Sequence, residues 1–175
     1  ADLGEGPFPT RDDRRDYVDR TAVTLMRAAA RLCKPDIDLG GEAGAAIHAA
    51  GRLWGFTGLA RAFAALCQAG RPPFAADELA GAALDEADLA RGAKPLEAKA
   101  ALKGLLAEAD EARNMLKRTR SVLPAEVFPA VGYAGLARGY LKQVKALNDP
   151  YRELADRPLS QRQWRLTWGS LTGRI

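Results

Sequence analysis

The sequence predicts an all-α protein, and three observations lead to that class. Apolar residues recur at helical spacing in several long segments, glycine or proline separates these segments, and no stretch alternates apolar and polar residues as a strand would. With 175 residues, of which 47% are hydrophobic, the chain is long enough to bury a core. We therefore expect one all-α domain over residues 1–175.

The first helix is predicted to begin at a cap on Thr10 and to end near Cys33, before Pro35. The second helix is predicted from Ala43 to Leu66, about seven turns. Apolar residues repeat along both, and in the first helix these are Val18, Ala22, Leu25, Met26 and Ala29.

Two short helices and a long one should follow. Asp77 is expected to cap a helix that runs to about Ala83, and 85–91 reads as another turn or two. The long helix should run from Pro95, a favourable first-turn residue, to about Val122. Its inward-facing residues are predicted to be Leu102, Leu105, Leu106, Ala109, Met115 and Leu116.

The C-terminal part is predicted to hold two more helices. One runs from Val131 to Leu147 and stops before Pro150. The other begins with Ser160, which has capping-box spacing to Gln163.

Composition and charge exclude several functions. The net charge of +4 comes from charges that are mixed along the chain, and no DNA-binding motif is present, so we expect no nucleic-acid partner. No run reaches the roughly 18 apolar residues that a membrane span needs. Cys33 and Cys67 lie far apart without metal-ligand spacing, which indicates reduced, packed thiols. The expected location is a bacterial cytoplasm or the surface of the inner membrane, or the matrix side of a mitochondrion.

The acidic residues near the N-terminus resemble a magnesium motif only in spacing. Asp12 and Asp16 are four residues apart, which would place both on one helix face. With Asp13, however, they occupy the first turns of a helix, where the helix dipole favours acids. We interpret them as a solvated helix start. The acidic groups at 85–88 and 108–111 are likewise interpreted as solvated faces.

No catalytic residue and no metal ligand is predicted. His48 is the only histidine, so the chain cannot form a multi-histidine metal site, and a structural role is favoured. No phosphate-binding loop, nucleophile elbow or zinc motif is present.

The C-terminal segment, 151–175, is predicted to be amphipathic and basic. Trp164, Trp168, Leu171 and Ile175 share one helical stripe, and three arginines lie off it: Arg162, Arg165 and Arg174. Such a segment can lie on an anionic membrane or on a protein partner through Trp164, Arg165 and Trp168. The alternative is that it packs back on its own domain, since tryptophan buries a large area.

The stretch from Gly51 to Leu79, GRLWGFTGLARAFAALCQAGRPPFAADEL, resembles the second signature of the squalene and phytoene synthase family. That signature is a helix reading Gly-x-x-x-Gln-x-Thr-Asn-x-x-Arg-Asp-x-x-x-Asp, followed by Gly-Arg and a Leu-Pro loop. The matching positions are Gly51, Thr57, Leu59, Arg61, Gly70, Arg71, Asp77 and Leu79. Of these, the resemblance makes Thr57, Arg61, Gly70 and Arg71 the candidate substrate-binding residues.

Several departures from the signature concern its chemistry. Ala62 and Leu66 replace both aspartates, which are metal ligands in the family's enzymes. The glutamine, the asparagine and the loop proline are also replaced, by Gly55, Gly58 and Ala75.

The resemblance implies an isoprenoid synthase-like helical bundle. The segments 17–32 and 127–147 resemble the helix before the signature and the penultimate helix of the family. The resemblance covers the last two thirds or so of the family's length, and the first aspartate motif would lie upstream of Tyr17. We therefore expect either a chain without its N-terminal third or a shortened relative.

In the family's enzymes two aspartate motifs hold Mg²⁺ on the diphosphate of an isoprenoid. Without one motif, the chain resembles the non-catalytic branch, whose mitochondrial member is a respiratory complex I assembly factor. We expect a binding or assembly factor with an apolar cavity for an isoprenoid or lipid, a protein or membrane partner, and no cofactor. One alternative is a Mg²⁺-dependent prenyltransferase with carboxylates elsewhere, for instance in a missing N-terminal part or at Asp12 and Asp16. Another is a peripheral membrane or respiratory-chain module driven by the tail.

Overall fold

The first long helix follows directly from its cap. The computed structural model describes residues 6–172, and the helix comprises α1 (Arg11–Val18), a π-helical stretch η1 (Asp19–Val23) and α2 (Thr24–Cys33). The Thr10 side chain accepts a hydrogen bond from the Asp13 backbone N–H, and the Asp13 carboxylate accepts one from the Thr10 N–H. This reciprocal cap satisfies two helix-end donors, and the predicted bounds are confirmed.

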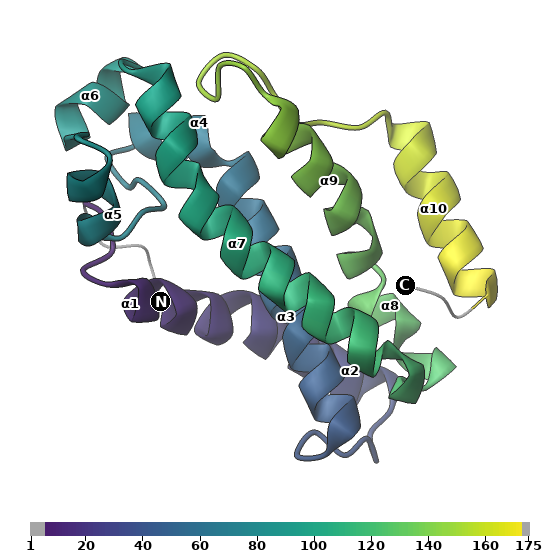
Figure 1. Cartoon of the computed structure of the whole chain (residues 1–175). Helices are drawn as coiled ribbons and strands as arrows, with labels where there is room; N and C mark the ends of the chain where they lie inside the picture. Colours follow the sequence, from purple (N-terminus) through teal and green to yellow (C-terminus); the bar gives the residue numbers. More distant parts are fainter. Residues whose placement is uncertain (1–5, 173–175) are drawn as a thin grey trace.

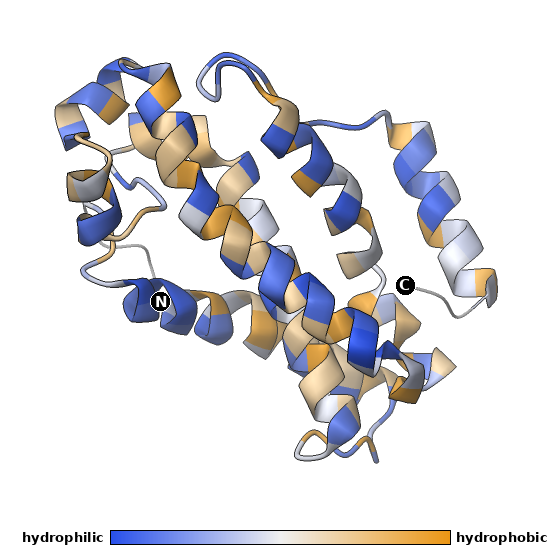
Figure 2. Cartoon of the chain, viewed as in Figure 1, coloured by the Kyte–Doolittle hydropathy of each residue, from blue (hydrophilic) through white to orange (hydrophobic). Residues whose placement is uncertain are grey.

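The second predicted helix is divided in two at Ala62. Its parts are α3 (Glu42–Arg61) and α4 (Phe63–Gln68). Helix α3 is central to the bundle: it packs against α7 (Pro95–Thr119), α9 (Ala134–Ala146) and the long first helix (Figure 1). Hydrophobic residues predominate in α4, whereas α1 is mostly hydrophilic (Figure 2).

Glycines allow α3 to approach the first helix closely. A Cβ atom at Gly51 would lie 2.8 Å from Val23 Cα, and one at Gly55 would lie 2.6 Å from Val18 Cγ1. Neither distance leaves room for a side chain, so both glycines are required by helix packing.

The short helices are α5 (Ala76–Gly81) and α6 (Glu86–Arg91). Asp85 caps α6 through the Asp88 N–H, at 2.6 Å, but the expected cap of α5 is wrong. Asp77 lies within the first turn of α5, and Glu78 instead accepts a hydrogen bond from the Ala75 N–H at 3.0 Å. Helix α7 starts at Pro95 as predicted and passes into η2 (Arg120–Val122).

The C-terminal part contains η3 (Ala125–Val127), α8 (Phe128–Val131), α9 and α10 (Leu159–Thr172). The helix predicted over 131–147 is therefore divided between α8 and α9. Helix α10 begins one residue before Ser160, so Ser160 is inside the helix and the predicted cap is wrong. Within residues 6–172 the only strand-like pairing is a single bridge between Phe8 and Ala75, and no helix is long and apolar enough to cross a membrane.

Candidate functional site

The candidate site is an apolar groove between the first long helix, α3, α4 and α8. Its volume is about 590 Å³, within the usual range of ligand pockets. None of the described residues that line the groove is charged. The groove is lined by Tyr17, Val18, Thr21, Ala22, Leu25, Met26, Ala29, Trp54, Gly55, Gly58, Leu59, Ala62, Leu66, Pro129, Ala130 and Tyr133.

The groove opens where α3 diverges from the first helix. Gly55, Gly58, Ala62 and Leu66 follow one another at spacings of three or four and share a face of α3 and α4. Gly55 still contacts the first helix, but a Cβ at Gly58 would meet nothing within 4 Å. Both positions of the signature aspartates, Ala62 and Leu66, therefore line the open part of the groove.

Apolar side chains are unusually exposed along this groove. Leu25 is 71% exposed and Tyr133 is 50% exposed. Leu25 belongs to the predicted apolar stripe of the first helix, yet it lines the groove and lies outside the core. An open apolar surface of this kind is typical of a binding site.

Thr57 and Arg61 do not line the groove. Thr57 is fully buried, and its hydroxyl donates to the Leu53 carbonyl at 2.6 Å. The Arg61 guanidinium stacks over the Tyr140 ring at 3.8 Å and donates to the Ala155 carbonyl at 3.0 Å. In this structure Thr57 belongs to the core, and Arg61 fastens the segment before α10.

Gly70 and Arg71 end α4. Gly70 has φ +68°, its N–H donates to the Cys67 carbonyl, and the Arg71 N–H donates to the Leu66 carbonyl. This pair of bonds is a Schellman cap, which explains the glycine. Neither residue lines the groove, so none of the four candidate substrate-binding residues does, whereas the two former ligand positions, Ala62 and Leu66, do.

The acidic residues of α1 are paired at the surface. Asp12 lies 2.8 Å from Arg15 and Asp16 lies 3.0 Å from Arg20, in agreement with a solvated helix start. The described residues contain no group of three His, Cys, Asp or Glu side chains that could hold a metal ion.

A buried ionic cluster was missed from the sequence. Arg14 is fully buried and donates to Glu108 at 2.9 Å and to Glu78 at 3.0 Å. Arg15 also reaches Glu108, at 2.9 Å. Burial alone would lower the pKa of Arg14, but the two carboxylates outweigh it and the pKa is raised. The interpretation of Glu108 as part of a solvated face is wrong, because it is only 7% exposed.

His48 belongs to a second ionic cluster, with Asp19 and Arg52. Arg52 donates to the two Asp19 carboxylate oxygens at 2.8 and 2.6 Å, and His48 Nε2 lies 3.4 Å from Asp19. Burial lowers the pKa of His48 more than Asp19 raises it. These contacts join α3 to the π-helical stretch and support a structural role for His48.

The tryptophans of α10 are largely exposed. Trp164 and Trp168 are 69% and 57% exposed, and their rings stack with centroids 6.1 Å apart. The helix itself packs on α8 and α9, and Gly169 is buried. The helix therefore docks on its own domain while both indole rings stay largely exposed.

The helical architecture and the groove define a class, that of all-α helical bundles with an apolar groove between their helices. The family is given by comparison with known proteins: the model of the squalene/phytoene synthase family matches residues 1–171. The chain therefore belongs to the squalene/phytoene synthase family, and the predicted all-α, isoprenoid synthase-like fold is confirmed. Searches of the curated proteins and of the solved structures found no match.

Proposed function

We propose that this protein is a non-catalytic member of the squalene/phytoene synthase family that binds an isoprenoid or another lipid chain in the apolar groove. It would serve as a binding or assembly factor, like the complex I assembly branch that the sequence resembles. The observation that carries the proposal is that Ala62 and Leu66, at the positions of the signature carboxylates, line an uncharged groove.

The physical reason is the charge of the leaving group. A departing diphosphate needs metal ions or other cations to balance its charge, and this stabilisation is worth several kcal/mol or more. Methyl and isobutyl side chains cannot coordinate Mg²⁺. They can favour an apolar chain, since burial stabilises by about 25 cal/mol per Å² of apolar surface.

Incubation with farnesyl diphosphate and Mg²⁺ tests the absence of catalysis. We expect no condensed product by chromatography and mass spectrometry. Condensed product would overturn the proposal and favour the prenyltransferase alternative. In that case Asp12→Ala should abolish turnover while Asp36→Ala, an exposed control, should not.

Binding of farnesol tests the groove itself. Gly58→Phe places a ring in open space that lines the groove and should abolish farnesol binding, measured by calorimetry, with the melting temperature unchanged or raised. Gly81→Phe is the matched control, because Gly81 also faces open space and does not line the groove. Unaltered farnesol binding in Gly58→Phe would exclude the groove as the binding site. Farnesol binding to the unaltered protein should not require Mg²⁺.

We further propose that the exposed tryptophans of α10 contact a protein partner or a membrane surface, which would place the protein at a bacterial inner membrane or at the matrix side of a mitochondrial one. Their exposure and stacking support this role. Trp164→Ala combined with Trp168→Ala should then weaken sedimentation with anionic liposomes or capture of the partner. If both are unchanged, the tail has another role.

A further inference from the structure

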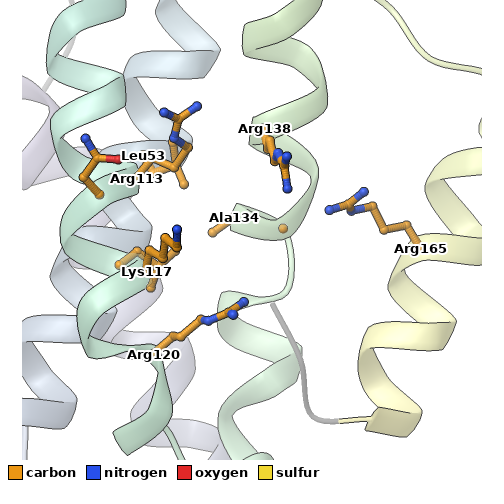
Figure 3. A pocket seen from close by; sticks show the side chains of 10 residues that line it. Leu53, Arg113, Lys117, Arg120, Ala134, Arg138 and Arg165 are labelled. Atoms are coloured by element: carbon orange, nitrogen blue, oxygen red, sulfur yellow. The ribbon is translucent and has the colours of Figure 1, made fainter.

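A second cavity lies between α7, α9 and α10 and shares no lining residue with the groove. Its volume is about 410 Å³. Five of its lining residues are cationic and none is acidic: Arg113, Lys117, Arg120, Arg138 and Arg165. In Figure 3 the side chains of Arg120, Arg138 and Arg165 extend into the space between the helices.

The cavity continues into an adjacent one of about 340 Å³. Arg113, Arg138 and Arg165 line both, and the second adds three cations: Lys142, Lys145 and Arg157. We call the two cavities together the basic cleft. Asp110 pairs with two of these cations: it binds Lys145 and lies 3.3 Å from Arg113.

Arg157, at the edge of the basic cleft, packs closely on α9. Its guanidinium lies against the backbone of α9, where a Cβ at Gly139 would be only 2.3 Å from Arg157 Cζ. Its Nε atom is buried and finds no hydrogen-bond partner among the described residues. This close packing fixes the charge of Arg157 at the edge of the cleft.

We propose that the basic cleft binds a phosphate-bearing anion, either a soluble phosphate ester or a lipid headgroup. Like charges gathered in a concave site raise the local potential and attract an anion. The planar guanidinium group matches the geometry of the phosphate oxygens. Hydrogen bonds between these charged groups are stronger than hydrogen bonds between neutral groups. The inference does not depend on the proposed function of the groove.

The concave shape favours a phosphate group over an acidic protein surface, because cations from three helices converge on a space of headgroup size. The exposed tryptophans adjoin it: Trp164 and Trp168 line a further cavity together with Arg157 and Arg165. An apolar surface beside a phosphate site would suit a lipid, whereas a soluble ester would need only the cations.

Titration of the whole protein with inorganic diphosphate tests the site by calorimetry. The variant Arg138→Gln with Arg165→Gln should weaken binding at least about tenfold, the loss expected when charge-assisted bonds are removed. Arg31→Gln with Arg118→Gln has the same net charge, alters exposed cations outside the cleft, and should change the affinity less than about twofold. An equal loss in both variants would overturn the proposal.

Vesicles of phosphatidylcholine with phosphatidic acid distinguish the two sources. If the unaltered protein and the control variant sediment with these vesicles and the cleft variant does not, the ligand is a lipid headgroup. If the protein binds diphosphate but does not sediment, the ligand is a soluble ester. Binding of neither, or an equal affinity for citrate, would overturn the proposal. Circular dichroism should show both variants folded; if the double variant is not, Lys117→Gln against Arg118→Gln repeats the comparison with single changes.

Discussion

Arg14 joins the N-terminal helix to the rest of the bundle through two buried ion pairs. It is the largest fully buried side chain of the described residues and lies between two buried carboxylates, Glu78 and Glu108. A buried ion pair contributes little to the stability of a fold compared with apolar residues in place of both partners. The loss of one partner, however, leaves the other as an uncompensated buried charge.

Arg14→Met should therefore lower the free energy of unfolding by about 3–5 kcal/mol, measured with urea at neutral pH. Arg20→Met is the control: its partner Asp16 is exposed, and the change should cost at most about 1 kcal/mol. Addition of Glu78→Gln and Glu108→Gln to Arg14→Met should recover part of the loss. Equal effects of the two arginine variants would contradict a structural role for the buried cluster.

Asp19 gives the stability a pH dependence. Burial would raise the pKa of its carboxyl, but the hydrogen bonds and charge of Arg52 outweigh burial and lower it. A carboxyl with a lowered pKa stabilises the fold above the ordinary value of 3.8, and this contribution is lost as the pH falls below it.

Arg52→Gln should cost about 1 kcal/mol at neutral pH because the partly buried pair is broken. The difference from the unaltered protein should shrink as the pH falls below the ordinary aspartate pKa, where Asp19 becomes protonated in both. Melting curves from pH 7 to pH 3 check this. A difference that is the same at every pH would exclude the ion pair as its cause.

At the scale of elements, one face of α3 has two roles along its length. Gly51 and Gly55 pack against the first helix, whereas Gly58 faces the open groove. The same residue type is therefore required for helix packing at Gly55 and leaves open space in the groove at Gly58.

Gly55→Leu should destabilise the protein by about 1–3 kcal/mol, because its side chain overlaps Val18 and Ala22. Gly58→Leu should leave the stability equal or raise it by up to about 1 kcal/mol, as expected for a helical glycine without neighbours. Chemical denaturation of both variants tests the contrast. Equal destabilisation would mean that the groove is closed at Gly58.

A helix end can be predicted from the sequence when residues within one turn determine it, but not when it depends on contacts with distant residues. Thr10, Pro95 and Asp85 mark helix starts through bonds within one turn, so the sequence suffices to find them. The break at Ala62 and the division between α8 and α9 have no such local signal. Arg14 and Glu108 meet across 94 positions of the chain, and no spacing rule relates them.

For the whole molecule, Cys67 reports on the cooperativity of the fold. It is 1% exposed, and burial raises its pKa to about 12. Since the thiolate is the reactive form, the native protein should protect Cys67.

With iodoacetamide at neutral pH, the partly exposed Cys33 should be modified first, and Cys67 only when urea reaches the unfolding midpoint. Mass spectrometry of the peptides measures each site. Rapid modification of Cys67 without urea would indicate that α4 opens separately from the rest of the bundle.

The sequence by itself determined the all-α class, most helix ends and the loss of the signature aspartates, because periodicity, caps and a linear motif are local properties. Only the tertiary structure decided which residues meet. It places Ala62 and Leu66 on an apolar groove, turns Thr57 and Arg61 away from it, and gathers cations from α7, α9 and α10 into one cleft. A binding site needs convergence from several elements in space, and that convergence depends on how the helices pack.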